Sequence, residues 1–152
     1  MRQGHADSFS PINRFEGYAG FLNSVTEALD IVDELGTEQV GVLGDLFHMN
    51  IEDGAVPDTL RVAGRRLWQI HLADSNRQAP GTGHLDFLEI LRVLDDIGFQ
   101  GYLSLDSVPP LPDWKTVVRE SIRFMKQMEQ AVDLQRHILK ERRSGRSAQT
   151  VP

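Results

Sequence analysis

The chain has 152 residues, of which 40% are hydrophobic and 25% are charged, a composition normal for one globular domain with a sizeable core. The formal net charge of −6 argues against a nucleic-acid partner, and the absence of cysteine excludes disulfides, thiolate metal sites and cysteine nucleophiles. Met1 to Asn13 lacks the apolar core of a signal peptide, and no segment approaches the roughly 20 apolar residues of a membrane span, so we expect a cytoplasmic protein without a membrane partner.

The first elements in chain order are a weak strand, a helix and a second strand. A short strand is expected near Phe9–Ile12. Asn23 or Ser24 can cap a helix whose apolar residues recur at three- and four-residue steps, and Gly36 can end it. The apolar run Val40–Leu43 follows directly and predicts a buried parallel strand.

The same alternation continues through the middle of the chain. A helix over about Asp58–Arg66 is followed by an apolar run that predicts a strand over Trp68–Ala73. Asp86 can cap a further helix, which Gly98 closes. The run Gly101–Leu105 then predicts another strand.

The last predicted element is a long helix. Three prolines break the chain after the last strand, and Asp113 can cap an amphipathic helix that runs to about Arg143. Residues 144–152 are expected to form a disordered tail. The sequence therefore predicts one domain over residues 1–143 and no second domain.

The order of these elements indicates the fold class. Strands that alternate with helices predict an α/β fold, in which a parallel sheet has its helices packed outside. A complete TIM (β/α)8 barrel takes about 250 residues, so a chain of 152 residues has room for about half of one. A doubly wound sheet is the alternative, but no glycine-rich phosphate loop follows the first strand.

Polar residues stand where two of the predicted strands end. Asp45 and His71 occupy these positions, and His48 lies three residues after Asp45 in what we expect to be a loop. Barrel enzymes hold their catalytic groups at the C-terminal ends of the strands, and carboxylate with imidazole suits Mn²⁺, Mg²⁺ or Co²⁺. Asp45 could instead cap a helix or turn, and His71 could be a core histidine, so the residues alone leave both interpretations open.

Four blocks of the sequence resemble a known family. They are Pro-Ile-Asn-Arg-Phe-Glu (11–16), Asp-Leu-Phe-His-Met-Asn (45–50), His-Leu-Ala-Asp-Ser-Asn-Arg (71–77) with Pro-Gly-Thr-Gly-His-Leu-Asp (80–86), and Gly-Tyr-Leu-Ser-Leu (101–105). In order and spacing they resemble the xylose isomerase-like TIM barrels, in particular the D-tagatose and D-psicose 3-epimerase branch. The resemblance runs from about Ser10 to Val118 and implies a partial TIM barrel made of the last four βα units.

The resemblance also implies a metal site. In these epimerases Glu, Asp, His and Glu from the last four strands hold a divalent ion, with Mn²⁺ the first expectation here and Mg²⁺ or Co²⁺ as alternatives. Asp45 and His71 match the Asp and His ligands. Ser10 and Asp106 stand where the family has its two glutamates, so Asp106 is the candidate for both a metal ligand and a catalytic group.

The implied activity is that of a ketose isomerase or epimerase. Glu16, His48 and Arg77 match residues that bind the sugar or sugar phosphate. In the family the two glutamates pass a proton through an enediolate, and the metal stabilises its negative charge. Serine cannot act as a carboxylate base and aspartate is one methylene shorter than glutamate, so Ser10 and Asp106 predict a truncated or degenerate member with little activity.

Two other functions compete with this interpretation. The first is a non-catalytic remnant that keeps affinity for a sugar or metal, or only a surface that binds a partner protein. The second is a different enzyme on the same barrel, such as an endonuclease IV-like phosphodiesterase. That enzyme needs a cluster of several metals with more His and Glu ligands than these positions supply, and a net charge of −6 disfavours DNA.

A half barrel also has consequences for assembly. The first strand and Gly101–Leu105 would each keep one unpaired edge, which favours association. We assign Val42, Leu43, Ile70 and Leu103 to the inner face of the sheet, which would lose the cover of the opposite strands. We therefore expect a homo-oligomer or association with a separate N-terminal half of the barrel.

Overall fold

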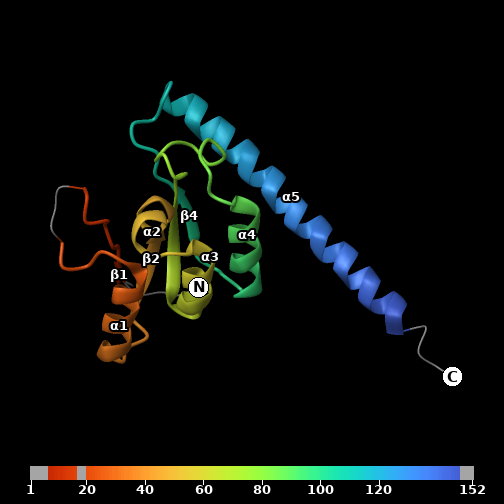
Figure 1. The fold of residues 1–152 in the computed structure, drawn as a ribbon, viewed down its shortest axis with the longest axis horizontal. Helices are drawn as coiled ribbons and strands as arrows, with labels where there is room; N and C mark the ends of the chain where they lie inside the picture. The colour runs from red at the N-terminus through yellow and green to blue at the C-terminus, as the bar shows by residue number, and fades with distance from the viewer. Residues whose placement is uncertain (1–6, 17–19, 148–152) are drawn as a thin grey trace.

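The computed structural model describes residues 7–16 and 20–147, which form one parallel sheet with helices around it (Figure 1). In chain order the elements are β1 (Asp7–Phe9), α1 (Val25–Leu35), β2 (Val40–Asp45), α2 (Leu46–Glu52), α3 (Val56–Ala63), the 3-10 helix η1 (Gly64–Arg66), β3 (Leu67–Leu72), α4 (Phe87–Asp96), β4 (Tyr102–Leu105) and α5 (Trp114–Ser147). The sheet order is β1-β2-β3-β4 and every neighbouring pair is parallel. This arrangement confirms the predicted partial barrel of four βα units.

The helix ends follow the predicted capping residues. Ser24 accepts a hydrogen bond from the backbone N–H of Glu27, and the Glu27 carboxylate accepts one from the backbone N–H of Ser24, so the two residues form a capping box at α1. Gly36 ends α1 with a φ of 60°, a left-handed conformation that glycine adopts without strain. Asp86 and Asp113 accept hydrogen bonds from the first-turn N–H groups of α4 and α5.

The largest differences from the predicted elements lie at three places. The first strand is Asp7–Phe9 instead of Phe9–Ile12. The segment after β2 is the helix α2 and not a loop, so His48 is a helical residue. The long helix α5 continues to Ser147, past the expected end of the folded part at residue 143, and residues 148–152 of the predicted tail lie outside the described residues.

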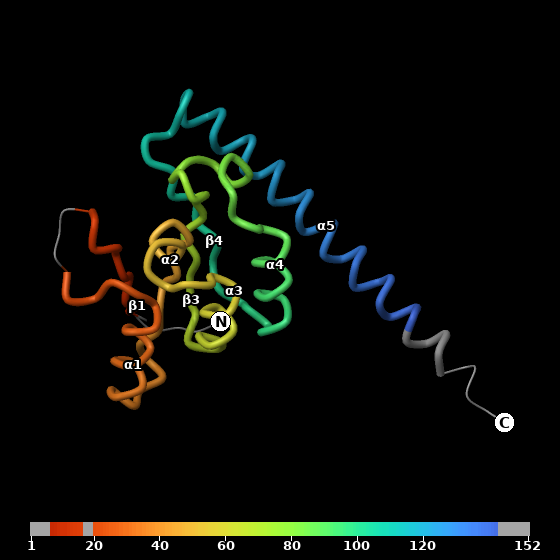
Figure 2. The backbone as a smooth tube through the Cα atoms, in the orientation of Figure 1, coloured from red at the N-terminus to blue at the C-terminus, as the bar shows by residue number. Residues whose placement is uncertain are grey.

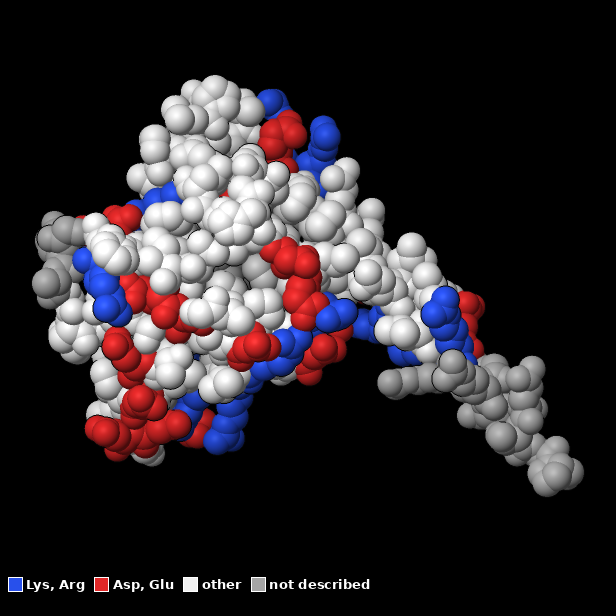
Figure 3. Space-filling view, viewed as in Figure 1, with Lys and Arg blue, Asp and Glu red and all other residues white. Residues whose placement is uncertain are grey.

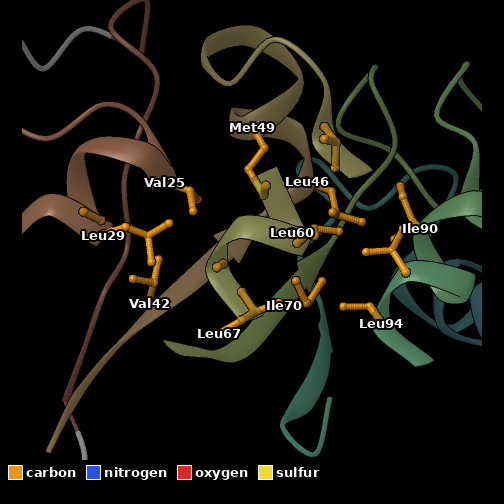
Figure 4. Packing of buried hydrophobic residues seen from close by; sticks show 14 of the residues in the cluster. Val25, Leu29, Val42, Leu46, Met49, Leu60, Leu67, Ile70, Ile90 and Leu94 are labelled. Atoms are coloured by element: carbon orange, nitrogen blue, oxygen red, sulfur yellow. The ribbon is translucent and has the colours of Figure 1, made fainter. Parts of the chain in front are cut away.

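The hydrophobic core lies between the sheet and the helices on its outer side (Figure 4). Val42 of β2 and Ile70 of β3 are fully buried in this cluster. The prediction that they lie on an uncovered inner face is therefore wrong. Side chains alternate along a strand, and Val42 and Ile70 point toward the helix layer, on the same face as Gly44. Leu103 of β4 lies on the same outer face and is 43% exposed, since the helix layer is incomplete at this edge.

The long helix α5 leaves the body of the molecule. Figures 1 and 2 show that its first part runs past α4, whereas its C-terminal part projects beyond the sheet and the other helices. A salt bridge between Arg136 of α5 and Asp95 of α4 joins the two helices, which also pack against each other. None of the described helices, α5 included, combines the length and apolar character needed to cross a membrane.

A buried carboxylate organises the loop between β3 and α4. Asp74 is fully buried. Its carboxylate accepts hydrogen bonds from four backbone N–H groups of the loop, which belong to Ser75, Gly81, Gly83 and Leu85. Burial by itself would raise the pKa of Asp74, but these donors together hold the pKa below its ordinary value. The loop that follows β3 is therefore fixed to the end of that strand.

Replacing a buried leucine by alanine tests the core. We expect Leu60→Ala in α3, where the side chain is fully buried, to lower the free energy of unfolding by about 2–5 kcal/mol. The matched variant Leu134→Ala in α5, where the side chain is 60% exposed, should change it by less than about 0.5 kcal/mol. Urea unfolding followed by circular dichroism measures both, and equal losses would contradict the assigned core.

The Asp74 carboxylate predicts a pH dependence of stability. Because its pKa is lower in the folded state, ionised Asp74 stabilises the fold at neutral pH, and this contribution disappears as the pH falls from about 4 through the folded-state pKa. Asp74→Asn should therefore have a lower free energy of unfolding than the wild type at pH 7. As the pH falls, this free energy should decrease less in the variant than in the wild type. Exposed Asp96 supplies the control, Asp96→Asn, which should retain the wild-type profile in urea titrations from pH 7 to 3.

Candidate metal centre

Three side chains meet at the C-terminal ends of β2, β3 and β4. The Nδ1 atom of His71 lies 3.4 Å from Oδ2 of Asp45 and 3.7 Å from Oδ2 of Asp106. One ligand atom from each residue lies within 4.8 Å of the others. The structure thus brings together the three residues that the sequence analysis named as candidate metal ligands.

The parallel register explains why these residues converge. Asp45 pairs with His71 across β2 and β3, and His71 pairs with Ser104 across β3 and β4. Asp106 lies two residues after Ser104 and its N–H still donates to the carbonyl of Leu72, so it extends the ladder on the same face as His71. Adjacent strands therefore deliver their polar residues to one point.

Asp45 has two roles at once. Its Oδ1 accepts hydrogen bonds from the N–H groups of Phe47 and His48, at 3.0 and 3.3 Å, and so caps α2. Its Oδ2 faces His71. The helix-cap and ligand interpretations of Asp45 are thus compatible, because each uses a different oxygen.

Burial sets the electrostatics beside this cluster. Asp45 is only 3% exposed, and burial raises the pKa of its carboxyl despite the nearby imidazole of His48. Burial also lowers the pKa of His48, against the attraction of Asp45, which favours its neutral form. A divalent cation beside Asp45 would supply the positive charge that its ionised form lacks in this buried position.

Arg77 connects the cluster with Glu16, another of the predicted sugar-binding residues. Its guanidinium contacts Glu16 at 2.7 Å and Asp106 at 4.0 Å, and it stacks over the ring of Phe47 at 5.1 Å. Arg77 itself has a φ of 59°, an uncommon value for a residue with a side chain. The loop that Asp74 fixes therefore presents Arg77 to the edge of the cluster.

His48 is held by a residue that the sequence analysis did not single out. Its Nδ1 lies 2.7 Å from Nδ2 of Asn13 and accepts a longer hydrogen bond, at 3.4 Å, from the backbone N–H of Asn13. A ring nitrogen that accepts from N–H leaves Nε2 as the protonated nitrogen of the neutral ring. Asn13 and Phe47 both lie in the motif blocks, but only the three-dimensional contacts show that they position His48 and Arg77.

Ser10 does not join the cluster. It follows β1 directly and is exposed, and among the described residues its side chain has no hydrogen-bond partner. A serine hydroxyl is also a weak neutral ligand compared with a carboxylate. Among the described residues the candidate centre therefore has three possible ligands, Asp45, His71 and Asp106, and no carboxylate at position 10, where β1 has just ended.

The donor set of the cluster fits a hard divalent cation. Two carboxylates and one imidazole are the ligand types of Mn²⁺, Mg²⁺ or Co²⁺ sites. His71 and Asp106 are partly exposed, so the cluster opens toward solvent on one side. Three protein ligands with an open side would leave coordination positions for water or for oxygen atoms of a substrate.

Several known proteins with matching sequences are sugar epimerases. The family model described as xylose isomerase-like TIM barrel matches residues 10–128. A D-psicose 3-epimerase of Enterocloster bolteae is 48% identical over 90 residues, which are 59% of this chain and 29% of that protein. A 3-dehydro-D-guloside 4-epimerase of Escherichia coli is 28% identical over 125 residues, 82% of this chain and 47% of that protein. The chain thus spans between about a third and a half of these relatives.

Solved structures give the same picture at the level of the fold. A structure of L-ribulose 3-epimerase superposes with a TM-score of 0.78 and 24% identity over 95% of this chain and 52% of that chain. The structure of D-psicose 3-epimerase with D-tagatose from Clostridium cellulolyticum H10 superposes with a TM-score of 0.68 and 28% identity. The match covers 80% of this chain and 48% of that chain. Since the family model covers well over half of the sequence and the four parallel βα units superpose on these barrels, this chain belongs to the xylose isomerase-like TIM barrel family.

Proposed function

We propose that this chain carries the metal- and sugar-binding half of a ketose epimerase and has lost most of the catalytic power of that site. The observation that carries the proposal is the cluster of Asp45, His71 and Asp106, with Arg77 beside it, at the C-terminal edge of the sheet. The relatives support the substrate class, because those that match include D-psicose and L-ribulose 3-epimerases. The substrate would be a ketose or a phosphorylated ketose.

Asp45, His71 and Asp106 would hold the cation in this proposal. When bound, a divalent ion polarises a sugar carbonyl and stabilises negative charge on its oxygen. Mn²⁺ is the first candidate, and Mg²⁺ or Co²⁺ satisfy the same ligand types. Asp45 keeps its cap on α2 while it offers Oδ2, so the ligand stays fixed without a rearrangement of the backbone.

The neighbouring residues would bind and orient the sugar. Arg77 is held by Glu16 and Phe47, which leaves its guanidinium directed along the edge of the cluster as a donor to sugar hydroxyl groups. His48, whose Nδ1 is occupied by Asn13, can donate from Nε2. Glu16 would accept hydrogen bonds from a sugar hydroxyl with the carboxylate oxygen that Arg77 does not use.

Proton transfer is where the site is deficient. Epimerisation at a carbon beside a carbonyl removes a proton on one face and returns one on the other, so two groups on opposite sides are required. Asp106 supplies a carboxylate on the β4 side. Ser10 supplies none on the β1 side, and this is the observation that favours a second candidate, a non-catalytic protein that binds a sugar or a metal.

Calorimetric titration with Mn²⁺ tests the metal site. We expect weak binding to the wild type and a further loss of at least about tenfold in Asp106→Asn, since even indirect partners of a metal typically alter affinity about 10–100-fold. The matched variant Asp96→Asn removes an exposed carboxylate at the end of α4 and should bind as the wild type does. Identical heats for all three proteins would refute the assignment of the cluster.

Restoring the missing carboxylates tests the reaction. The unmodified chain should convert D-fructose to D-psicose very slowly or not at all. Ser10→Glu combined with Asp106→Glu should raise the rate, because a general base typically contributes about 10²–10⁴-fold. Ser10→Gln with Asp106→Glu has the same side-chain length without the base and should stay inactive. Chromatography of the sugars with Mn²⁺ present measures this, and rapid turnover by the unmodified chain would contradict it.

A further inference from the structure

A tight turn at residues 13–16 carries two groups that support the candidate site. The backbone N–H of Glu16 donates to the carbonyl of Asn13 at 3.2 Å and closes the turn. The Asn13 side chain contacts Nδ1 of His48 at 2.7 Å, and the Glu16 carboxylate contacts Arg77 at 2.7 Å. The turn can therefore align both pairs only if it is itself held in one orientation.

The guanidinium of Arg14, the second residue of this turn, binds both carboxylate oxygens of Glu52. Its Nε lies 3.1 Å from Oε1 and 3.0 Å from Oε2, and its Nη2 lies 2.8 Å from Oε2. The backbone N–H of Arg14 also donates to Oε1, at 2.9 Å. The Glu52 side chain is 4% exposed and that of Arg14 is 62% exposed, so the guanidinium covers a buried carboxylate. A planar fork that binds two oxygens fixes orientation as well as distance.

Both contacts of the turn are made with one face of α2. His48 and Glu52 are four residues apart in this helix, so their side chains lie one helical turn apart on the same side. Asn13 binds the first and Arg14 binds the second. One contact alone would leave the turn free to rotate about it, and a second contact roughly 5 Å along the helix opposes that rotation. The same helix begins after the candidate ligand Asp45, so it connects the turn with the metal cluster.

The pairing of Arg14 with Glu52 stands out in an acidic neighbourhood. All charged residues of α1 are acidic, and Figure 3 shows acidic side chains gathered over this helix at the lower left, with basic side chains beside them. Two other carboxylates, those of Glu27 and Asp53, lie near this end of α2. Both accept hydrogen bonds from backbone N–H groups at the start of α1 or just before it. Among the ion pairs of the described residues, the partner of Arg14 is Glu52.

We propose that Arg14 is a positioning residue, which acts through Glu52 to dock this turn on α2. Arg14 does not contact the sugar in this proposal. It fixes the turn, and the turn in its place orients two side chains that would bind the sugar, His48 and Arg77. The effect on sugar binding rests on the proposed function, whereas the docking of the turn does not.

NMR spectroscopy of the full chain tests the docking of the turn. Glu52→Gln keeps the size of the side chain and removes its charge, so the fork should loosen. We expect the side-chain amide signals of Asn13 and the Nε–H signal of Arg77 to shift. The backbone signal of His71 in β3 should stay in place, because the fold itself is retained.

Two further variants complete this test. Glu89→Gln breaks a comparable ion pair with Arg61, which joins α3 to α4 in the helix layer, and should leave the signals of the turn unchanged. Arg14→Lys keeps the positive charge on an exposed side chain but loses the fork. It should shift the same signals, and it carries the test if the buried substitution Glu52→Gln prevents folding.

Titration with D-fructose in the presence of Mg²⁺ tests the consequence for the site. The affinity should be about tenfold weaker in Glu52→Gln, the worth of about one hydrogen bond to a charged group. Arg14→Met and the double variant should show the same loss, since all three break one interaction. The affinity for Mg²⁺ itself should stay at the wild-type value, because the candidate metal ligands belong to the strand ends.

Each outcome decides for or against the role of Arg14. Unchanged signals of Asn13 and Arg77 in both Glu52→Gln and Arg14→Lys would overturn the proposal. Losses of sugar affinity that add up in the double variant would also overturn it, because Arg14 would then contact the sugar itself. Shifted signals in a protein whose wild type binds no D-fructose would support the docking and count against the proposed function alone.

Discussion

The parallel register of three neighbouring strands is the constraint on which the rest of this structure depends. It aligns Asp45 with His71 and brings Asp106 to the same face, because side chains alternate along each strand. The same alternation turns Val42 and Ile70 to the outer face, where the helices bury them. One register thus fixes both the core and the cluster, and a slip by one residue would exchange the two faces.

Two buried carboxylates attach the functional loops to this sheet. Asp45 caps α2 with one oxygen and keeps the other at the cluster, and Asp74 gathers the N–H groups of the loop that carries Arg77. Each uses the backbone of the following segment as its hydrogen-bond partner, so the segment cannot move without exposing an unpaired charge. The positions of His48 and Arg77 are therefore consequences of local hydrogen bonding at the strand ends.

The described part of the chain forms half of a barrel, and it places three candidate metal ligands at one end of the sheet. Among the described strands, β1 and β4 each have one edge without a partner strand, with exposed apolar groups beside it, and Asp106 of the cluster directly follows β4. The relatives that the chain matches are about twice as long as this chain.

Much of this protein is determined locally in its sequence. Caps such as Ser24, Gly36 and Asp86, and apolar runs such as those of β2 and β3, fixed the alternation of helix and strand, because capping and periodicity act over a few residues. Asp45 and His71 could be named as candidate metal ligands because they stand at strand ends, and Asp106 through the resemblance to the family. Tertiary structure alone decided that Val42 and Ile70 face the helices and that Asn13 and Phe47 support the site. These facts depend on contacts between segments far apart in the chain, which no local pattern records.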